Sequence, residues 1–538
     1  MQFTADPVFG RIEDAYQAYL EAWGSWMVRH HAGAQGKEGE QLAQALIATR
    51  GNLSEHLRTL GSRALSADDA AALQTLRSCL PELDAWAAPL DGLAFSDDDD
   101  PAEARPRRDA GAGAQHRAEA HADLRRATFE AWGDAMANLD VNGERLDRLT
   151  VMARLAREPD EARRRALFLS MEPAWRSLNG DDGPSSPYRR LLATSAARWA
   201  REGSPIDGNA AALGIEPASV EPTLRRVLAA YRRLALGDAL VEPWNYRYLL
   251  GDLARRLDPL VPIGRLREIN DAHLLSIGAD PAELRIQYDI TPRVGRPVIP
   301  TAFTVTEDVA QCRPDGAWTP ATPWVFATYA EGGIGNLEEL LHESGHALHY
   351  AAIRTRPAQF SWPPDQTAFV EAVADVVGWS THEPAFLGHH LGATVTARES
   401  AIARFMGVAL DGAHTLFEIE LHRHPDRSPN AVWAEIAERD LGVHGHSEWA
   451  WWAVRGQLID GPGYLANYAL GAIMVAAVRA RIRAARGEWS TGDPDWYAYV
   501  SEALLRYGGE RSPRDLLGGL LGGPLTAEAL VADIERSS

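Results

Sequence analysis

The chain has 538 residues, 46% of them hydrophobic, and a formal net charge of −20. This length and composition allow a large buried core and more than one lobe. The strong negative charge argues against nucleic acid or an anionic membrane as a partner.

Cysteine usage and the terminal sequence bear on the cellular compartment. Cys79 and Cys312 are far apart and have neither disulfide-scaffold nor zinc-ribbon spacing. Free thiols are expected in a reducing compartment. The first residues lack the pattern of a signal peptide, and no apolar run reaches about 18 residues. We therefore expect a cytoplasmic protein without a membrane span.

The first part of the chain shows the periodicity of amphipathic helices. The segment Arg11–Val28 places its apolar side chains on one stripe. Further helices are expected at Leu42–Leu60 and Asp68–Trp86. We expect a break in the last of these at Pro81, because proline removes a backbone donor.

A segment near residues 95–116 interrupts the helical series. It contains four consecutive acids followed by prolines, arginines and glycines. Such a composition cannot bury a core, so a disordered loop is expected there. We predict that residues 1–200 form a helical N-terminal lobe around this loop, and that residues 201–538 form a second lobe.

The pattern changes within residues 201–340. Short β-branched and aromatic runs separated by Gly and Pro predict a small sheet. These runs are Arg285–Ile290, Pro297–Pro300, Ala302–Val305 and Trp324–Tyr329. A glycine-rich turn, Glu331–Gly335, follows the last run and precedes a helical segment.

That helical segment contains the motif H-E-x-x-H. His342 and His346 are four residues apart and therefore share one helix face, where two imidazoles can bind one Zn²⁺. Glu343 lies beside such a metal and could take a proton from its bound water. Gly345 would let another element approach closely. The alternative is an ordinary solvated helix face, and a third ligand distinguishes the two.

A candidate third ligand lies in the next helical segment. Glu371 and Asp375 are one turn apart on an otherwise apolar helix. A buried carboxylate requires a cation or strong donors. Glu371 as third ligand, with Asp375 orienting a ligand histidine, satisfies this requirement. The alternative is that both acids face solvent.

Together, H-E-S-G-H-A-L-H and F-V-E-A resemble the zinc peptidases of the thimet oligopeptidase and oligoendopeptidase F family, which are gluzincins. The resemblance implies one Zn²⁺ per chain held by His342, His346 and Glu371, with Glu343 as the general base. It also places His349 and Asp375 beside the ligands. Gly378 stands where another family acid is expected.

The resemblance also implies a role in substrate binding for the strand and the turn that precede the motif. The last strand should run past the metal, and an edge strand there could hold an extended peptide by backbone hydrogen bonds. Tyr329, Gly332 and Gly333 are therefore predicted to bind substrate.

A downstream segment, residues 452–471, resembles the oligoendopeptidase F pattern W-A-x-x-x-H…P-x-Y-x-x-x-Y-A-x-G. The resemblance implies that Tyr464 and Tyr468 stabilise the oxyanion formed during hydrolysis. Gln457 stands where the family has a histidine; it can contact substrate but carries no charge. The alternative is that the two tyrosines are a packed helical pair.

We predict a mainly α fold, with two helical lobes around a deep channel and a small β-sheet beside the zinc helix, as in zincins. The predicted function is that of a zinc metalloendopeptidase that hydrolyses short oligopeptides. Two alternatives remain: a metal-dependent tailoring enzyme acting on a small molecule or a peptidyl intermediate, and a non-catalytic binding protein with a vestigial site.

Overall fold

The computed structural model describes residues 3–34, 36–87, 112–293, 299, 301–362 and 366–537. The chain divides into two compact units, each assembled from three segments. Unit 1 comprises Met1–Arg107, Asp258–Gly392 and Val478–Pro524, and unit 2 comprises the remainder. The boundary predicted near residue 200 differs from this division, because it falls inside a helix of unit 2, α8.

Unit 1 begins with three helices, α1(Pro7–His31), α2(Lys37–Leu60) and α3(Ala67–Ala87). The Asp6 side chain caps α1 by accepting from Val8 N at 2.8 Å, and Pro7 occupies the first turn, where its missing N–H is not needed. The predicted break at Pro81 is wrong, since α3 continues through it. Apolar side chains around the proline are buried and offset the lost hydrogen bond: Leu76, Cys79 and Leu80.

The second segment of unit 1 contains α13(Ile263–Ser276) and then a three-stranded sheet in the order β3-β7-β4. These strands are β3(Gln287–Asp289), β4(Phe303–Thr306) and β7(Pro323–Phe326). β7 is central, parallel to β3 and antiparallel to β4. The runs predicted at 285–290, 302–305 and 324–329 are confirmed as strands, whereas that at 297–300 lies outside the described residues except for Ile299.

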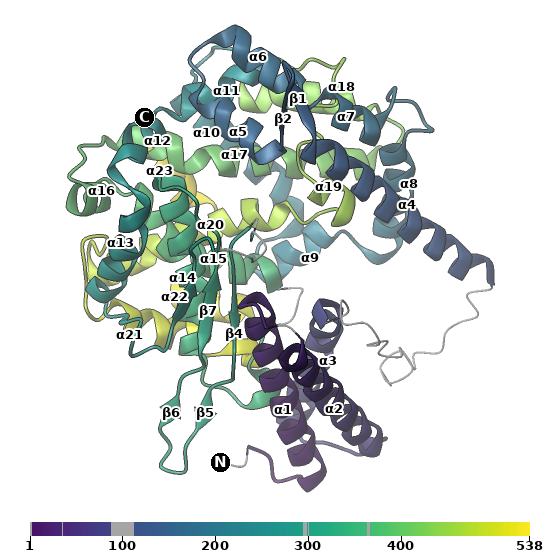
Figure 1. The fold of residues 1–538 in the computed structure, drawn as a ribbon, viewed down its shortest axis with the longest axis vertical. Coiled ribbons are helices and arrows are strands. Elements are labelled where there is room, and N and C mark those ends of the chain that lie inside the picture. Colours follow the sequence, from purple (N-terminus) through teal and green to yellow (C-terminus); the bar gives the residue numbers. More distant parts are fainter. Residues whose placement is uncertain are drawn as a thin grey trace. The chain divides into compact units, whose positions relative to one another are not determined.

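The sheet packs against the next helix, α14(Ile334–Ala352), through β4 and β7 (Figure 1). The other elements of this unit are the hairpin β5(Gln311–Cys312) and β6(Trp318–Thr319), η3(Asp258–Leu260), η4(Pro357–Gln359), α15(Thr367–Gly378), η6(Trp379–His382), α16(Pro384–Leu391), α21(Trp496–Val500), η8(Ser501–Leu505), η9(Gly508–Glu510) and α22(Pro513–Leu521). One core joins α1–α3 to the sheet and to the chain after α14, and Phe9, Tyr19, Phe326 and Phe360 are fully enclosed in it.

Unit 2 is also mainly helical. Its elements are α4(Ala112–Ala137), β1(Leu139–Val141), β2(Glu144–Leu146), α5(Arg148–Arg157), α6(Glu161–Leu169), α7(Glu172–Asn179), α8(Pro187–Glu202), α9(Pro205–Ala212), η2(Pro217–Ser219), α10(Val220–Ala235), α11(Pro243–Leu250), α12(Asp252–Leu257), α17(Ala397–Arg423), α18(Pro429–Ile436), η7(Ala437–Leu441), α19(Gln457–Asp460) and α23(Glu528–Arg536). Helix α20(Ala466–Arg486) contributes to both units. The loop predicted near 95–116 lies outside the described residues as far as 111, and α4 already begins at Ala112.

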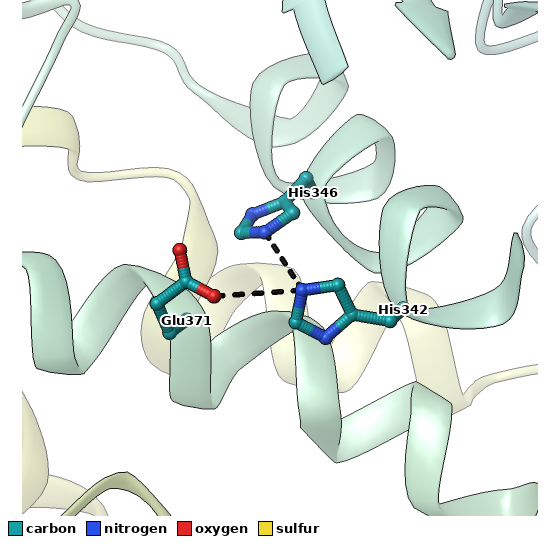
Figure 2. Close-up of side chains that lie close together, drawn as sticks. All are labelled: His342, His346 and Glu371. Carbon is teal, nitrogen blue, oxygen red and sulfur yellow. Dashed lines mark hydrogen bonds and ion pairs between the residues drawn. The ribbon is translucent and has the colours of Figure 1, made fainter. Parts of the chain in front are cut away.

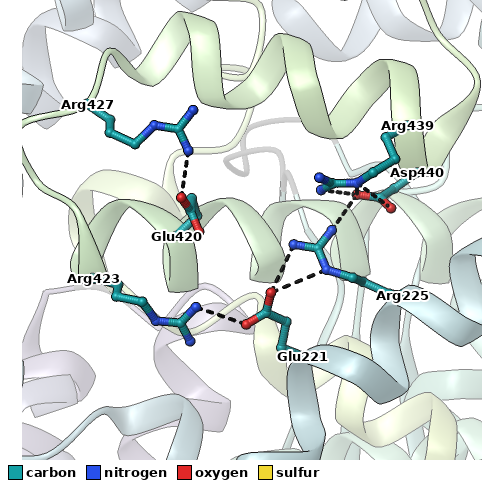
Figure 3. A network of polar contacts seen from close by, with 7 residues as sticks. All are labelled: Glu221, Arg225, Glu420, Arg423, Arg427, Arg439 and Asp440. Carbon is teal, nitrogen blue, oxygen red and sulfur yellow. Dashed lines mark hydrogen bonds and ion pairs between the residues drawn. The ribbon is translucent and has the colours of Figure 1, made fainter.

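A network of ion pairs joins α10, α17 and η7 in unit 2 (Figure 3). Its members are Glu221, Arg225, Glu420, Arg423, Arg427, Arg439 and Asp440. Arg225 donates to Glu221 at 2.9 Å and to Asp440 at 3.0 Å. Because Asp440 is buried and also accepts from Arg439, the network fixes these helices more firmly than an isolated surface pair would.

The predicted mainly α fold is confirmed, and a small sheet lies beside α14, the helix that carries the H-E-x-x-H motif. Among the described residues, no helix is both long enough and apolar enough to cross a membrane.

Candidate metal centre

The helix that carries the motif, α14, starts at a glycine turn. Gly333 has φ +112°, which disfavours any other residue, and its N–H donates to Val261 O at 2.8 Å. A Cβ at Gly332 would lie 2.0 Å from Val261 O. Asp258 accepts from Ile334 N at 3.0 Å, so it satisfies one of the first donors of the helix. These contacts fix where α14 begins. They therefore also fix the direction in which its third turn, which carries His342, faces.

His342 and His346 of α14 converge with Glu371 of α15 (Figure 2). The two Nε2 atoms of the histidines are 3.2 Å apart, and Glu371 Oε2 is 3.5 Å from His342 Nε2. Ligands at 2.0–2.1 Å from a tetrahedral zinc are separated by about 3.3 Å. Both separations therefore match edges of such a tetrahedron, and two imidazoles with one carboxylate are the donor set of many catalytic zinc sites.

These three residues form a group in which the ligand atoms lie within 4.8 Å of one another; no other group of His, Cys, Asp or Glu in the described part of the chain meets that criterion. The site thus has three protein donors and a fourth tetrahedral position without a protein ligand. An open fourth position is typical of catalytic rather than structural zinc.

Close packing of the two helices brings the ligands together. A Cβ at Gly345 would lie 2.5 Å from Ala374 O and 2.7 Å from Ala374 Cα. Only glycine therefore permits α15 to approach α14 this closely. The expectation that Gly345 accommodates a neighbouring element is confirmed.

Asp375 contacts the ring of His342, the first candidate ligand. Its Oδ1 lies 2.7 Å from Nδ1 of His342. A carboxylate at Nδ1 keeps the proton there, so the Nε2 lone pair is free for a metal. Burial alone would lower the pKa of His342, but Asp375, Glu371 and Glu343 together raise it well above its ordinary value. Gly378 stands where the family pattern has a further acid, and it packs against the backbone of His342. Asp375 is therefore the carboxylate that contacts Nδ1 of His342.

Glu343 lies on α14 next to the first ligand and outside the donor set. Thr304 Oγ1 of β4 is 2.7 Å from Glu343 Oε2, to which it donates. Burial raises the pKa of Glu343 to about 7. A carboxyl with this pKa can both take up and release a proton near neutral pH, which is what a general acid–base catalyst requires.

His349 is buried on the turn after His346. Trp362 Nε1 donates to its Nε2 at 2.8 Å. Burial lowers the pKa of His349 to about 3, so the ring is neutral at physiological pH. His349 contacts the rings of Trp362 and Phe369, and its predicted place beside the ligands stays a prediction.

A buried polar cluster supports α14 from α13 and β3. Ser344 Oγ is 2.8 Å from Asn270 Oδ1, and Tyr288 OH is 3.1 Å from both Ser344 Oγ and Asn270 Nδ2. Sequence reasoning missed Asn270, Tyr288 and Thr304. One signal was available, because Asn270 lies on the apolar face of α13 with Leu266 and Leu274.

The strand nearest the base differs from the predicted one. The expectation that the last strand is an edge strand is wrong, since β7 is hydrogen-bonded on both sides. The N–H of Tyr329, just after β7, donates to Ile290 O. The edge strand beside Glu343 is β4, which among the described strands pairs only with β7. Substrate binding by Tyr329, Gly332 and Gly333 stays a prediction.

Tyr464, Tyr468 and Gln457 belong to unit 2, whereas the metal centre belongs to unit 1. Gln457 is the first residue of α19. The rings of Tyr464 and Tyr468 lie 5.8 Å apart at an interplanar angle of 73°. Both side chains are half-buried, and their predicted contacts with substrate stay predictions.

No family model and no curated protein matches the chain. Solved structures match nearly all of it. An M32 carboxypeptidase from Deinococcus radiodurans R1 is 15% identical with a TM-score of 0.58, and the match covers 98% of both chains. A Pyrococcus furiosus carboxypeptidase is 14% identical with a TM-score of 0.55, and the match covers 100% of this chain and 99% of that chain.

A third similar structure is a protein assigned to oligoendopeptidase F. It is 14% identical with a TM-score of 0.52, and the match covers 100% of this chain and 97% of that chain. At such identities the likeness establishes the fold. The chain therefore has the mainly helical fold found in M32 carboxypeptidases and in oligoendopeptidase F-like proteins.

Proposed function

We propose that this protein is a zinc-dependent peptidase that hydrolyses short oligopeptides. The observation that carries the proposal is the convergence of His342, His346 and Glu371 at tetrahedral spacing, with Glu343 beside them but outside the donor set. The fold supports it, because similar solved structures include a carboxypeptidase of the M32 group and a protein assigned to oligoendopeptidase F.

The residues have separate roles in this reaction. Bound zinc supplies Lewis acidity, which polarises the scissile carbonyl and lowers the pKa of the attacking water. Glu343 takes the proton from that water and delivers it to the leaving amine. Asp375 holds His342 in the tautomer that ligates. Among the described strands, β4 pairs with β7 alone, so an extended peptide could add along its other side by backbone hydrogen bonds.

The roles of the unit 2 residues rest on their motif resemblance. Tyr464 is the proposed hydrogen-bond donor to the developing oxyanion, with Tyr468 as a second donor and Gln457 as a substrate contact. A neutral donor to an oxyanion contributes about 10²–10³ in rate. Replacing Tyr464 with Phe removes only the hydroxyl and tests that role directly.

We propose that the enzyme cleaves peptide bonds inside its substrates. One experiment distinguishes this activity from the removal of C-terminal residues. Purified protein is first analysed for bound metal and then incubated with a defined peptide library, with and without a chelator. Mass spectrometry reports the cut positions. Stoichiometric zinc and chelator-sensitive internal cuts support the proposal, whereas C-terminal ladders indicate a carboxypeptidase.

Zinc-loaded protein that ignores every peptide would support the tailoring enzyme instead. The three similar solved structures described above are two carboxypeptidases and a protein assigned to oligoendopeptidase F, so they do not favour the tailoring enzyme. Protein without stoichiometric zinc would support the vestigial binding site. Within the described residues, neither Cys79 nor Cys312 is in a disulfide, which fits the proposed cytoplasmic location.

The proposed base is tested with Glu343→Gln. An amide cannot accept the proton, so hydrolysis should fall by at least about 10³-fold while zinc content is retained. The matched control is Glu268→Gln, since Glu268 is exposed on α13 and only pairs with Arg265 at 3.5 Å. An active Glu343→Gln enzyme would contradict the assignment.

A further inference from the structure

A tightly packed turn in unit 2 precedes α20 and carries Tyr464. Gly463, directly before the tyrosine, has φ +91°, a conformation that favours glycine. A Cβ at Gly463 would lie 2.7 Å from Pro205 Cγ and 3.3 Å from Trp199 Cζ2. The turn is therefore closely packed on one side and has little room to shift in that direction.

The other contact of this turn is with a buried acid on α17. Glu418 Oε1 accepts from Gly463 N at 2.7 Å. Glu418 is 1% exposed, and within the described residues its Oε2 has no hydrogen-bond partner. A buried carboxyl without a second partner is expensive, and no step proposed above uses it.

We propose that Glu418 is a positioning residue that holds the turn through the Gly463 N–H and thereby sets the position of the Tyr464 hydroxyl. This inference rests on the proposed role of Tyr464 in oxyanion stabilisation. The physical reason is that the buried Gly463 N–H needs an acceptor, and without Glu418 the turn must rearrange to find one. A displacement of about 1 Å in a catalytic group can cost about 10²-fold in rate.

The surroundings of Glu418 favour its neutral form. Burial raises the pKa of Glu418 to about 8. Among the described residues, Tyr188 of α8 lies close enough to interact electrostatically with the Glu418 carboxyl, and Nδ1 of His422, one turn along α17, is 2.8 Å from the backbone oxygen of Glu418. Burial lowers the pKa of His422 to about 4, and Ser195 contacts its Nε2 at 2.9 Å. Neither group supplies a positive charge at neutral pH, so ionisation above about pH 8 would place an uncompensated charge beside the turn.

The kinetic test compares Glu418→Leu, Glu418→Gln and Tyr464→Phe. Leucine removes the acceptor, and kcat should fall about 10–100-fold with KM within about twofold, since the oxyanion donor acts in the transition state. Glutamine keeps an acceptor oxygen, and kcat at pH 7 should stay within about threefold. Because glutamine does not ionise, the decline of kcat above about pH 8 in the parent enzyme should move to higher pH.

A double variant separates positioning from general damage. If Glu418 acts through Tyr464, then Glu418→Leu combined with Tyr464→Phe should be no slower than Tyr464→Phe alone. Losses that multiply would overturn the inference. The control on the same helix is Glu420→Gln, which alters the pair with Arg427 and should leave kcat unchanged.

Hydrogen exchange tests the contact between Glu418 and the Gly463 N–H independently of enzyme activity. In peptides that cover residues 461–465, exchange should speed up at least about tenfold in Glu418→Leu and stay near the parent rate in Glu418→Gln. Unchanged exchange in the leucine variant, or an unmoved alkaline limb in the glutamine variant, would overturn the inference.

Failure of this inference is distinguishable from failure of the proposed function. A fully active Tyr464→Phe enzyme, together with an inactive Glu343→Gln enzyme, would overturn the inference and leave the peptidase assignment intact. A parent protein that hydrolyses no peptide would overturn the proposed function and with it the catalytic part of the inference.

Discussion

At the scale of single residues, the centre is built from groups whose environment decides their protonation. Glu343 is buried beside Thr304, and burial raises its pKa to about 7. His342 is held by Asp375, whereas burial lowers the pKa of His346 to about 4. His346 is therefore neutral at neutral pH, whereas the carboxylates around His342 raise its pKa and favour its protonated form, so a metal ion would displace a proton from His342 on binding.

The pH dependence of hydrolysis follows from Glu343. The base acts as a carboxylate, so kcat/KM should fall as the pH drops through its pKa. That value is about 7 without metal, and a neighbouring cation lowers it, so the acid limb should lie at or below pH 7. A pH–rate profile of kcat/KM checks this, and an acid limb clearly above pH 7 would contradict the assignment.

The orienting role of Asp375 predicts a change in metal affinity. In Asp375→Asn the partner of His342 Nδ1 loses its charge, so zinc should bind about 10–100-fold more weakly. Competition with a chromogenic chelator measures the affinity. Asp315→Asn, which alters an exposed side chain, is the control and should bind zinc as the parent does. Equal affinity in both variants would remove Asp375 from the centre.

The sequence was sufficient to predict that His342 and His346 lie close together, because helical spacing alone puts them on one face. It also indicated Glu371 and Asp375, because two acids on an apolar helix need a partner. Thr304 could not be predicted, since its contact with Glu343 depends on how β4 is placed in the sheet, which no local pattern encodes.

At the scale of elements, the centre depends on how closely α14 and α15 pack.

The strand order β3-β7-β4 shows what could not be predicted about the sheet from the sequence. Each strand was recognisable from its own residues, but pairing is non-local, so the last strand in sequence was mistaken for the edge.

The close spacing of α14 and α15 predicts how adding one methyl group at Gly345 would change zinc affinity. In Gly345→Ala the new Cβ would meet the Ala374 backbone at 2.5 Å, so the helices must separate and zinc affinity should fall at least about tenfold. Gly335→Ala on the same helix meets nothing within 4 Å and is the matched control. Zinc titration of both proteins checks this, and full affinity in Gly345→Ala would show that the helix spacing is not critical.

At the scale of the whole molecule, both units contain buried or half-buried histidines whose pKa is lowered. Burial lowers the pKa of His273 to about 3 and that of three others to about 4: His390, His414 and His422. Because these folded-state values lie below the unfolded value of about 6.5, their stabilisation is complete above that pH and is lost as the pH falls towards 4.

Unfolding free energy should therefore decrease on acidification from about pH 6.5, by up to about 1.4 kcal/mol per pH unit for each histidine. Urea unfolding of metal-free protein at several pH values measures this. His273 is fully buried, and neither ring nitrogen has a partner among the described residues. His273→Leu should flatten the dependence, and an unchanged slope would contradict the argument.

The division into units could not be read from the sequence. Composition along the chain suggested one boundary near residue 200, but each unit gathers three separated segments. Local patterns identify helices, whereas the pairing of distant segments depends on which apolar faces fit together in space.

The contact between Gly345 and Ala374 has a consequence beyond catalysis. The helices that carry the ligands are held together by packing rather than by a covalent link. An ion bound by donors from both helices recognises only the folded chain, so the folded population grows with the free concentration of that ion. With zinc as the ion proposed above, a shortage of zinc would shift the chain towards its unfolded state, which proteases degrade, as well as removing the proposed activity.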